Sequence, residues 1–267
     1  MNKAIEIKNL TYAYGNQRIL DNLSFGIQRG DFFIIIGPNG SGKTTLMKII
    51  SGITKLQQGE VTLLDQSLQR YTQRTLAKKI AYVPQMLPPD FPFTVAQLVL
   101  MGRAPYHGLL GVEQEKDFEI AKKAMTFTGV EQLSGRKFSQ LSGGEQQRAF
   151  IARAICQEPQ IILLDEPTTS LDLAHQVRIM DLMERLKIEK AITVVMVSHD
   201  VNLAAMYADH LLLLKAGHVA SLGRPQEVLT YKILEEAYGC TILVDKSPIG
   251  EYQRINLVPQ KNMIVDK

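Results

Sequence analysis

Apolar positions along the chain fall into two patterns, which together predict a mixed α/β protein. Near the start, apolar and polar residues alternate over 4–10 and 20–27, as expected for strands of an antiparallel sheet with one exposed face. Further on, uninterrupted apolar runs (FFIII at 32–36, IILL at 161–164, TVVMV at 193–197) predict buried strands of a parallel sheet.

Helical spacing and turn signals fill the rest of the chain. An amphipathic segment at 43–50 follows the first buried run, and the region from about Val95 to Cys156 is mostly helical in pattern. The shorter expected elements are strands at 60–64 and 79–84, a helix at 69–79, a hairpin at 211–222 around Ala216 and Gly217, a last helix at 225–238, two strands after Cys240, and an aromatic turn TYAYGNQRI between the first two strands.

Length and composition set broad limits on the class of protein. A chain of 267 residues is long enough for one sizeable core, so we expect one domain with a subdomain. Its 45% apolar and 21% charged residues are ordinary for a soluble globular protein. A net charge of +3, without a run of lysines and arginines, is too small to indicate a nucleic-acid partner.

No segment carries the signals of membrane insertion or export. The apolar runs are far shorter than the roughly 18 residues of a spanning helix, and the start MNKAIEIKNL lacks the apolar core of a signal peptide. We therefore expect a soluble cytoplasmic protein, with any membrane span supplied by another chain. Cys156 and Cys240 match no metal site, so both are expected to be reduced packing residues.

The loop between the first buried strand and the next helix carries the strongest chemical signal. Its sequence fits G-x-x-x-x-G-K-[ST], and the flanking strand and helix favour a phosphate-binding loop over a glycine-rich turn that merely joins two elements. Glycines let backbone NH groups approach phosphate oxygens, and the helix N-terminus adds its positive dipole. Lys43 is expected to reach the β and γ phosphates, and the Thr44 hydroxyl to complete a Mg²⁺ shell. The pattern residues are Gly37, Pro38, Asn39, Gly40, Ser41, Gly42, Lys43 and Thr44.

Two tyrosines precede this loop. Tyr14, just before Gly15, is placed to stack on a nucleotide base, a contact worth ~1 to 3 kcal/mol that tolerates any base. Tyr12 is the competing candidate, and a tyrosine that only packs at a turn is the plainer alternative.

Three predicted strands end in polar residues. Gln85 is either a polar cap or a ligand of Mg²⁺ or the attacking water, and the prolines of MLPPDFPF after it indicate a hinge-like loop. Asp165 is placed to hold Mg²⁺ through its water shell, and Glu166, facing another way, to polarise a water for attack on the γ phosphate. His199 emerges at the same sheet edge, where a neutral imidazole can bond the γ phosphate and the water, although a lone histidine is more often structural. The other histidines are expected at the surface: His107, His175, His210 and His218.

A helix start within the helical region contains a glycine pair. Ser142 and Glu145 fit a capping box, which by itself describes only a well-capped helix. Gly143 and Gly144 would cost roughly 1 kcal/mol each inside a helix, but they leave an open N-terminus that can lie against an anion. One chain cannot easily press this end onto its own phosphate loop, which suggests a second copy. Asp172, in SLD, either begins a later helix at a dipole-favoured position or has a further role.

In chain order, GPNGSGKTT, YVPQ, LSGGEQQR, IILLDEP, SLD and VSHD resemble the complete motif set of an ABC-type ATPase, over about residues 5–238. The resemblance implies an α/β fold: a phosphate-loop NTPase core with a parallel sheet, an N-terminal antiparallel β subdomain and an inserted helical subdomain at about 88–158. One domain would span 1–240, with a short extension at 241–267. It also implies ATP hydrolysis with ATP and Mg²⁺, in a head-to-tail homodimer that holds each ATP between one chain's phosphate loop and the other's LSGGE.

The resemblance assigns a role to each matching residue. It implies that Tyr14 stacks on the base, that Gly37 to Thr45 form the phosphate loop, and that Gln85 senses nucleotide and moves with the membrane partner. Ser142, Gly143 and Gly144 would be the signature presented in trans, and Asp172 the aspartate that communicates across the dimer. Asp165 would be the Mg²⁺ aspartate, Glu166 the general base, and His199 the histidine that holds the γ phosphate.

Three further segments resemble the ATPase subunits of importers for iron siderophores, haem and vitamin B12: VAQLVLMGRAPYHGLLG, HDVNLAAMYADHLLLLKAGHVASLGRPQEVLT and ILVDKSPIGEYQRINLVPQ. They imply two integral membrane permease subunits, an extracytoplasmic substrate-binding protein, uptake of an iron chelate, haem or cobalamin-type substrate, and a location on the cytoplasmic face of the cell membrane. MGRAPYHG is expected near the groove that receives a short helix of the membrane subunit. A soluble ABC ATPase without a transport role, such as an iron–sulfur cluster assembly subunit, is the alternative. A DNA clamp is disfavoured because no long heptad pattern precedes LSGGE.

Overall fold

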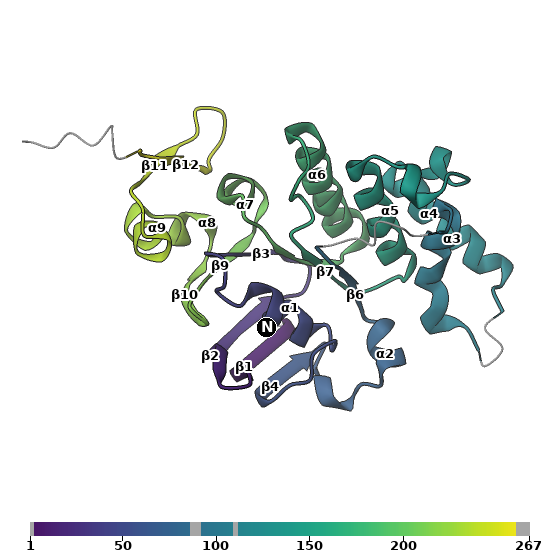
Figure 1. Cartoon of the computed structure of the whole chain (residues 1–267), viewed down its shortest axis with the longest axis horizontal. Helices are drawn as coiled ribbons and strands as arrows, with labels where there is room; N and C mark the ends of the chain where they lie inside the picture. Colours follow the sequence, from purple (N-terminus) through teal and green to yellow (C-terminus); the bar gives the residue numbers. More distant parts are fainter. Residues whose placement is uncertain (1–2, 86–91, 109–111, 260–267) are drawn as a thin grey trace, which may run out of the picture.

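The computed structural model describes residues 3–85, 92–108 and 112–259. Its centre is a six-stranded sheet in the order β10-β9-β3-β8-β7-β6 (Figure 1). The strands are β3 (Phe32–Ile36), β6 (Ile80–Val83), β7 (Ile161–Asp165), β8 (Thr193–Val197), β9 (His210–Lys215) and β10 (His218–Gly223). Five of them run parallel, and β10 pairs antiparallel with β9. The three uninterrupted apolar runs are therefore strands of a parallel sheet, as predicted.

Strand β3 shows why these runs are continuous rather than alternating. All five of its residues are buried, but on opposite faces of the sheet: Phe32, Ile34 and Ile36 pack into one hydrophobic cluster, and Phe33 and Ile35 into another. Burial of such side chains stabilises the fold by about 1.5–3 kcal/mol each. The sheet is thus held from both sides.

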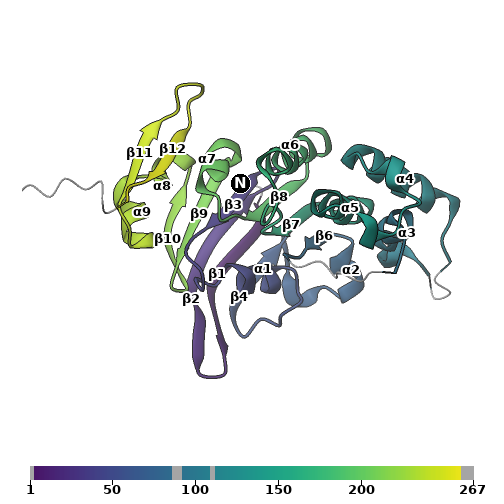
Figure 2. The ribbon, with the colours of Figure 1, turned by 45° about the horizontal axis from the view of Figure 1, so that its top comes forward.

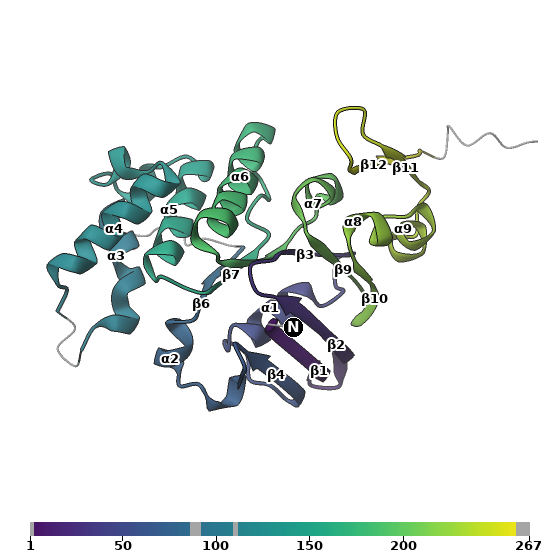
Figure 3. The same ribbon diagram turned by 180° about the vertical axis from the view of Figure 1, so that it is seen from behind.

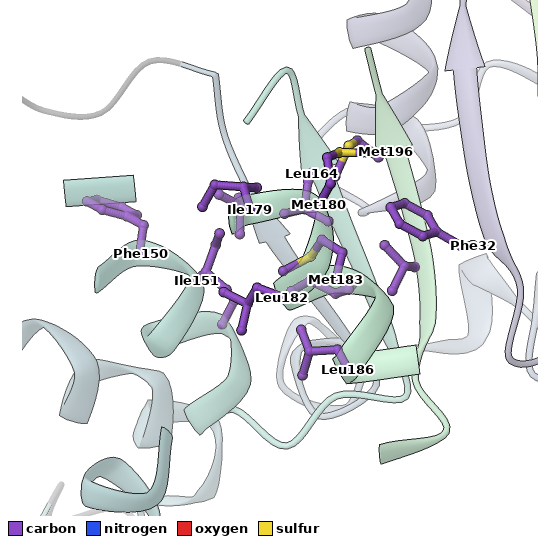
Figure 4. Close-up of a cluster of buried hydrophobic side chains, with 14 of the residues drawn as sticks. Phe32, Phe150, Ile151, Leu164, Ile179, Met180, Leu182, Met183, Leu186 and Met196 are labelled. Atoms are coloured by element: carbon purple, nitrogen blue, oxygen red, sulfur yellow. The ribbon is translucent and has the colours of Figure 1, made fainter. Parts of the chain in front are cut away.

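Helices cover one face of this sheet. The predicted helical region at 95–156 consists of α3 (Val95–Leu100), α4 (Glu115–Thr128) and α5 (Gly143–Cys156), with 3-10 turns η2 (Met101–Tyr106), η3 (Glu131–Leu133) and η4 (Phe138–Gln140) between them. α6 (Leu173–Lys190) and α7 (Val201–Tyr207) complete the layer. Figure 4 shows Ile151 of α5 and Met180 and Met183 of α6 in one cluster with Phe32 and Leu164 of the strands.

The opposite face carries α1 (Lys43–Ile50) and a second sheet in the order β2-β1-β4-β5 (Figure 3). Its strands are β1 (Lys3–Tyr14), β2 (Gln17–Gln28), β4 (Gln58–Leu63) and β5 (Gln66–Ser67), all paired antiparallel, which confirms the N-terminal antiparallel subdomain. The predicted nine-residue aromatic turn is wrong. Tyr12 lies opposite Leu20 and Tyr14 opposite Gln17, so only Gly15 and Asn16 form a tight hairpin turn.

Two predicted helices are shorter or divided. The helix expected at 69–79 is a 3-10 turn, η1 (Leu68–Arg70), followed by α2 (Gln73–Ala77), and the one expected at 225–238 is α8 (Pro225–Val228) and α9 (Tyr231–Tyr238). Between α8 and α9, Leu229 has a non-helical ψ of 62°, and the Thr230 side chain accepts from the Ile233 NH to cap α9. The sequence pattern does not reveal this break, because Leu229 before it and Leu234 after it are both buried in the same hydrophobic cluster and so continue the apolar spacing.

The hairpin around Ala216 and Gly217 and the two strands of the tail, β11 (Ile242–Lys246) and β12 (Gln253–Leu257), are confirmed. Cys156 is buried as expected, but Cys240 is exposed, so its predicted packing role is wrong. Nowhere in the described ranges is a helix both long and apolar enough to cross a membrane.

Some predictions fall on residues that the structure does not describe. These are most of the proline-rich loop after Gln85 together with the start of the predicted helical subdomain (86–91), part of MGRAPYHGLLG (109–111), and both ends of the predicted domains (1–2 and 260–267).

Candidate nucleotide-binding site

Parallel strands bring the candidate residues to one edge of the central sheet. β3 leads into the loop at 37–42, Gln85 follows β6, Asp165 ends β7, and His199 follows β8. The carboxyl ends of parallel strands share an edge, which is where α/β proteins bind ligands. Side chains that are far apart in the sequence therefore lie together around the phosphate loop.

Two glycines of this loop cannot be replaced without moving their surroundings. Gly37 has φ 145°, and a Cβ there would lie 2.0 Å from the Leu214 carbonyl oxygen. Gly42 has φ 102°, and its Cβ would lie 2.5 Å from Leu20 Cδ2. The loop thus keeps its backbone against both sheets, and leads directly into α1.

Lys43 is held inside the loop. Its side chain is buried, and Nζ donates to the carbonyl oxygens of Gly37 at 2.8 Å and Pro38 at 2.9 Å. Burial lowers the pKa of Lys43, while the nearby carboxylates of Glu166 and Asp165 act in the opposite direction. The ammonium group is thus fixed against the first two carbonyl groups of the loop.

The hydroxyl of Ser41 is a buried polar group without a partner. The residue is 2% exposed, and Oγ makes no hydrogen bond within the described part of the chain. Such groups are rare in folded proteins, because a buried unsatisfied donor costs stability. In a loop of this shape the unpaired hydroxyl fits a phosphate oxygen as acceptor.

Asp165 ends β7 in a buried position beside α1. Its carboxylate accepts from Thr44 Oγ1 at 3.3 Å and from the Tyr82 hydroxyl at 3.1 Å. Burial raises the pKa of Asp165, partly offset by these two hydrogen bonds. A desolvated carboxylate next to a hydroxyl is a donor set that suits Mg²⁺, so the residues present fit this ion.

Glu166, the next residue, has a left-handed backbone, with φ 52°. Its Oε1 lies 2.5 Å from His199 Nε2, and its Oε2 accepts from the Gln85 amide and from Thr169 Oγ1 at 3.3 Å. A positive φ on a non-glycine residue is uncommon and costs energy, so the surroundings must hold it. Three side chains from separate loops thus fix one carboxylate.

A hollow of ≈ 240 Å³ lies over the phosphate loop, and we refer to it as the phosphate-loop hollow. Lys43 and Glu166 both line it. Its lining residues are Ile19, Asn39, Gly40, Gly42, Lys43, Thr44, Thr45 and Glu166.

The two tyrosines that precede the loop differ in exposure. Tyr14 is 51% exposed, whereas Tyr12 is 7% exposed. Their rings meet edge to face at 5.0 Å between centroids. Of the two, only Tyr14 has a ring surface free to stack on a base.

The glycine pair begins α5, away from this hollow. Ser142 caps the helix by accepting from the Glu145 NH, and the Glu145 carboxylate accepts from the Ser142 NH at 2.8 Å, which is a complete capping box. Ser142, Gly143 and Gly144 are not among the residues that line the phosphate-loop hollow. The candidate residues thus form two separate groups in one chain.

Asp172 caps α6, and His175 joins it to the start of α5. The Asp172 carboxylate accepts from the His175 NH at 2.8 Å, and His175 Nδ1 lies 2.9 Å from both carboxylate oxygens. The imidazole packs on Gly144, where a Cβ would lie 2.3 Å from its Cδ2. His175, expected to be an ordinary surface residue, is therefore a contact between the two motifs.

The other histidines follow the expectation in part. The side chains of His210 and His218 are 38% and 59% exposed, as predicted. That of His107 is only 14% exposed and lies 3.5 Å from Asp117, so its surface assignment is wrong. Sequence spacing missed this because Asp117 is on the next helix.

Sequence reasoning also missed three residues of the site: Tyr82, Thr169 and Ile19. The Tyr82 hydroxyl bonds to Asp165, the Thr169 hydroxyl to Glu166, and Ile19 lines the hollow. A signal existed for Tyr82, which is the one polar side chain in the strand sequence IAYV and lies on the neighbour of β7.

A phosphate loop between a parallel strand and a helix, with an acidic pair at the end of a neighbouring strand, defines a phosphate-loop nucleotide-binding protein. The family model for the ABC transporter matches residues 20–169, more than half of the chain. The chain belongs to this family, in its ATP-binding part, and is therefore an ATPase.

Curated relatives and solved structures agree with this assignment. The chain is 38% identical to the petrobactin import ATP-binding protein FpuD of Bacillus anthracis, over 93% of this chain and 91% of that protein. It is 38% identical to the ferric enterobactin transport ATP-binding protein FepC of Escherichia coli K12, over 91% and 90%, and 39% identical to the hemin import ATP-binding protein HmuV of Thermobifida fusca, over 90% and 84%. A metal-chelate type ABC transporter in an inward-facing conformation has a TM-score of 0.87 at 30% identity, over 98% and 99% of the two chains. A bacterial ABC transporter cassette solved as a dimer has a TM-score of 0.71 at 34% identity, over 82% and 98%.

Proposed function

We propose that this chain is the ATP-hydrolysing subunit of an ABC importer, which couples ATP binding and hydrolysis in a homodimer to uptake through separate membrane subunits. The observation that carries the proposal is the similarity, over at least 84% of each chain, to ATP-binding proteins named for petrobactin, ferric enterobactin and hemin transport. The geometry of the site supports it, because each group that hydrolysis needs has a candidate residue.

In the proposed reaction, Glu166 is the general base. Its carboxylate, held by Gln85, His199 and Thr169 at the wall of the hollow, takes the proton of the attacking water. Lys43 and the NH groups of the loop stabilise the charge on the phosphoryl oxygens.

Thr44 and Asp165 are the residues proposed to hold Mg²⁺, with Gln85 as a further candidate ligand. Bound together with ATP, the ion would offset charge on the phosphate oxygens. Tyr14 is proposed to stack on the base, and Pro38, Asn39, Gly40, Ser41 and Thr45 to surround the phosphates.

The other half of each ATP site is proposed to come from a second copy of the chain. Ser142 and Gly143 are exposed at the N-terminus of α5, where free NH groups and the helix dipole favour an anion. Asp172, bonded to the same region through His175, would lie at the dimer interface. The similar cassette solved as a dimer supports this arrangement.

The proposed cargo is an iron chelate, haem or cobalamin-type substrate. Cargo selection would belong to two integral membrane permease subunits and an extracytoplasmic substrate-binding protein, and the ATPase would lie on the cytoplasmic face of the membrane. The names of the relatives support the iron and haem classes. A soluble ABC ATPase without a transport role remains the second candidate.

One purification separates the two candidates. The tagged chain is isolated from gently solubilised native membranes, and the proteins present in stoichiometric amount are identified. We expect a polytopic permease together with an extracytoplasmic binding protein, whose bound ligand would identify the cargo. Recovery with soluble scaffold proteins alone would leave the ATPase in place and overturn the importer.

A further inference from the structure

A second hollow, of ≈ 450 Å³, lies where the end of α4 meets the facing sides of α5 and α6. Three arginines line it, Arg148 from α5 and Arg178 and Arg185 from α6, together with a single carboxylate, that of Asp181. We refer to it as the arginine hollow. It shares no lining residue with the phosphate-loop hollow.

The acid and one of the arginines in this hollow already have partners. Asp181 accepts from the Tyr207 hydroxyl at 2.7 Å. Arg185 bonds to Glu189 at 3.2 Å, and its guanidinium lies 4.6 Å from the centre of the Phe127 ring. The guanidinium groups of Arg148 and Arg178, in contrast, make no hydrogen bond or ion pair within 3–85, 92–108 and 112–259.

Two like charges thus face one space without a salt bridge, although the carboxylates of Glu145 and Asp172 attract Arg148 and Arg178 respectively. Arg148 is half-buried, and the loss of water lowers its pKa; Glu145 opposes this shift and the repulsion by Arg178 adds to it. A desolvated cation beside a second cation is an unfavourable arrangement unless an anion joins them. The planar guanidinium group binds phosphate through two parallel NH groups, which makes a pair of arginines a good phosphate receptor.

We propose that the arginine hollow binds a phosphate dianion or a phosphate monoester, held between Arg148 and Arg178 with Arg185 at its edge. Free phosphate compounds and the headgroup of phosphatidic acid present this same chemistry. The site is distinct from the ATP site and does not depend on the proposed transport role.

The position of the hollow gives the bound anion a structural consequence. Arg148 lies in the second turn of α5, which begins at the glycine pair, and Arg178 in the second turn of α6, which Asp172 caps. The ribbon views show the two helices side by side (Figures 1 and 2). An anion between the arginines would therefore tie together the two helices that carry LSGGE and SLD.

The test is a calorimetric titration of the chain with inorganic phosphate at constant ionic strength. It uses the full chain with Lys43→Ala, because the phosphate loop would also bind the probe. Arg178→Gln in this background is expected to weaken binding by about 10-fold or more, the scale of lost charge-assisted hydrogen bonds. Arg254→Gln, which removes an exposed arginine on β12, is the matched control and should leave binding unchanged.

Arg148→Gln is expected to have the same effect, and thermal unfolding checks that this half-buried change leaves the chain folded. Because Arg178 is exposed, Arg178→Gln carries the test even if Arg148→Gln fails to fold. No measurable phosphate binding, with no vesicle binding either, would overturn the proposal, and so would an equal loss with Arg254→Gln.

Vesicles distinguish the two sources of the anion. Phosphatidylcholine vesicles with phosphatidic acid are compared with vesicles that carry an equal charge as phosphatidylserine. A preference for phosphatidic acid that Arg178→Gln abolishes assigns the site to a lipid headgroup, whereas phosphate binding without that preference assigns it to a soluble anion. Equal binding to both vesicle types, unaffected by Arg178→Gln and without binding of phosphate, would show only general surface charge and overturn the site.

Discussion

The two halves of the proposed ATP site are built differently. At the phosphate loop, the charged groups of Lys43, Asp165 and Glu166 are at most 7% exposed, and each is held by hydrogen bonds or an ion pair. At the start of α5, Ser142 and Gly143 are exposed, and among the described residues the Ser142 side chain bonds only within its own first helical turn. In one half the charged groups are buried and paired, and the other half is open.

This difference follows from the cost of removing charge from water. Buried ionic groups must be paired within the chain, because an unpaired one would shift its pKa or destabilise the fold. An exposed helix end is satisfied by water and by its cap, so it keeps NH groups available for an anion brought by another molecule. We therefore expect substitutions in the first half to damage binding and chemistry directly, and glycine-to-alanine changes in the second half, which keep the backbone NH groups, to act through local packing.

The largest expected effect is that of Glu166→Gln. Loss of the general base should reduce ATP turnover by ~100-fold or more, while ATP binding is kept, because the amide has the shape of the carboxylate but cannot accept the proton. Phosphate release and equilibrium binding measure the two quantities separately. Glu60→Gln, an exposed carboxylate on β4, is the control, and near-normal hydrolysis by Glu166→Gln would refute the assignment.

Lys43→Ala should act on binding. The variant loses charge-assisted hydrogen bonds to phosphate, so nucleotide affinity is expected to fall by roughly 10- to 100-fold. Lys48→Ala on the same helix lies outside the phosphate-loop hollow and is the matched control. Equal affinities of the two variants in equilibrium dialysis would count against the phosphate-loop half.

The phosphate-loop half could be predicted from the sequence, because its chemistry depends on local rules. A glycine-rich loop after a buried strand fixes Lys43, and the common edge of parallel strands brings Asp165 and His199 to it. Strand character is a local property, and the sheet order then follows from few topologies. The fold class was predictable for the same reason.

The contacts between helices could not be predicted in this way. Whether His175 touches Gly144, or Arg178 faces Arg148, depends on how α5 and α6 lie against each other, which no periodicity specifies. A charged or imidazole side chain on an amphipathic helix has the same pattern whether it faces water or a neighbouring helix. The left-handed backbone of Glu166 was hidden similarly, since only its tertiary partners hold it.

At the start of α5, a matched pair of variants tests packing. Alanine is a better helix former than glycine by about 1 kcal/mol, so Gly143→Ala should not destabilise the chain, and its Cβ would meet no atom nearer than 3.8 Å. Gly144→Ala places a Cβ 2.3 Å from His175 and should cost about 1–3 kcal/mol more, as in other overpacked sites. Thermal unfolding should therefore separate the two variants by several degrees.

The contact with His175 predicts its own rescue. In a His175→Ala background, Gly144→Ala should lose most of its penalty, because the ring that it meets is gone. Equal unfolding temperatures of Gly143→Ala and Gly144→Ala would mean that the helix start has as much space for a side chain at Gly144, beside His175, as at the exposed Gly143.

The smallest effect is expected for His175→Ala alone, and the quantity to measure is the pKa of the Asp172 carboxyl. The pKa of this carboxyl is lowered first by the backbone NH of residue 175, which alanine keeps, and only then by the imidazole. We expect the variant to raise the pKa of Asp172 part of the way to its usual value, as measured by NMR titration of the carboxyl carbon.

A carboxyl group whose pKa is lowered in the folded state stabilises the fold above its unfolded-state pKa. This contribution is lost as the pH falls through the folded-state pKa. The small stability difference between wild type and variant should therefore be present at neutral pH and vanish in acid. A full return of the Asp172 pKa to its usual value would show that the imidazole, and not the helix cap, holds this carboxylate, so that the open half of the site would depend on side-chain pairing as much as the phosphate loop does.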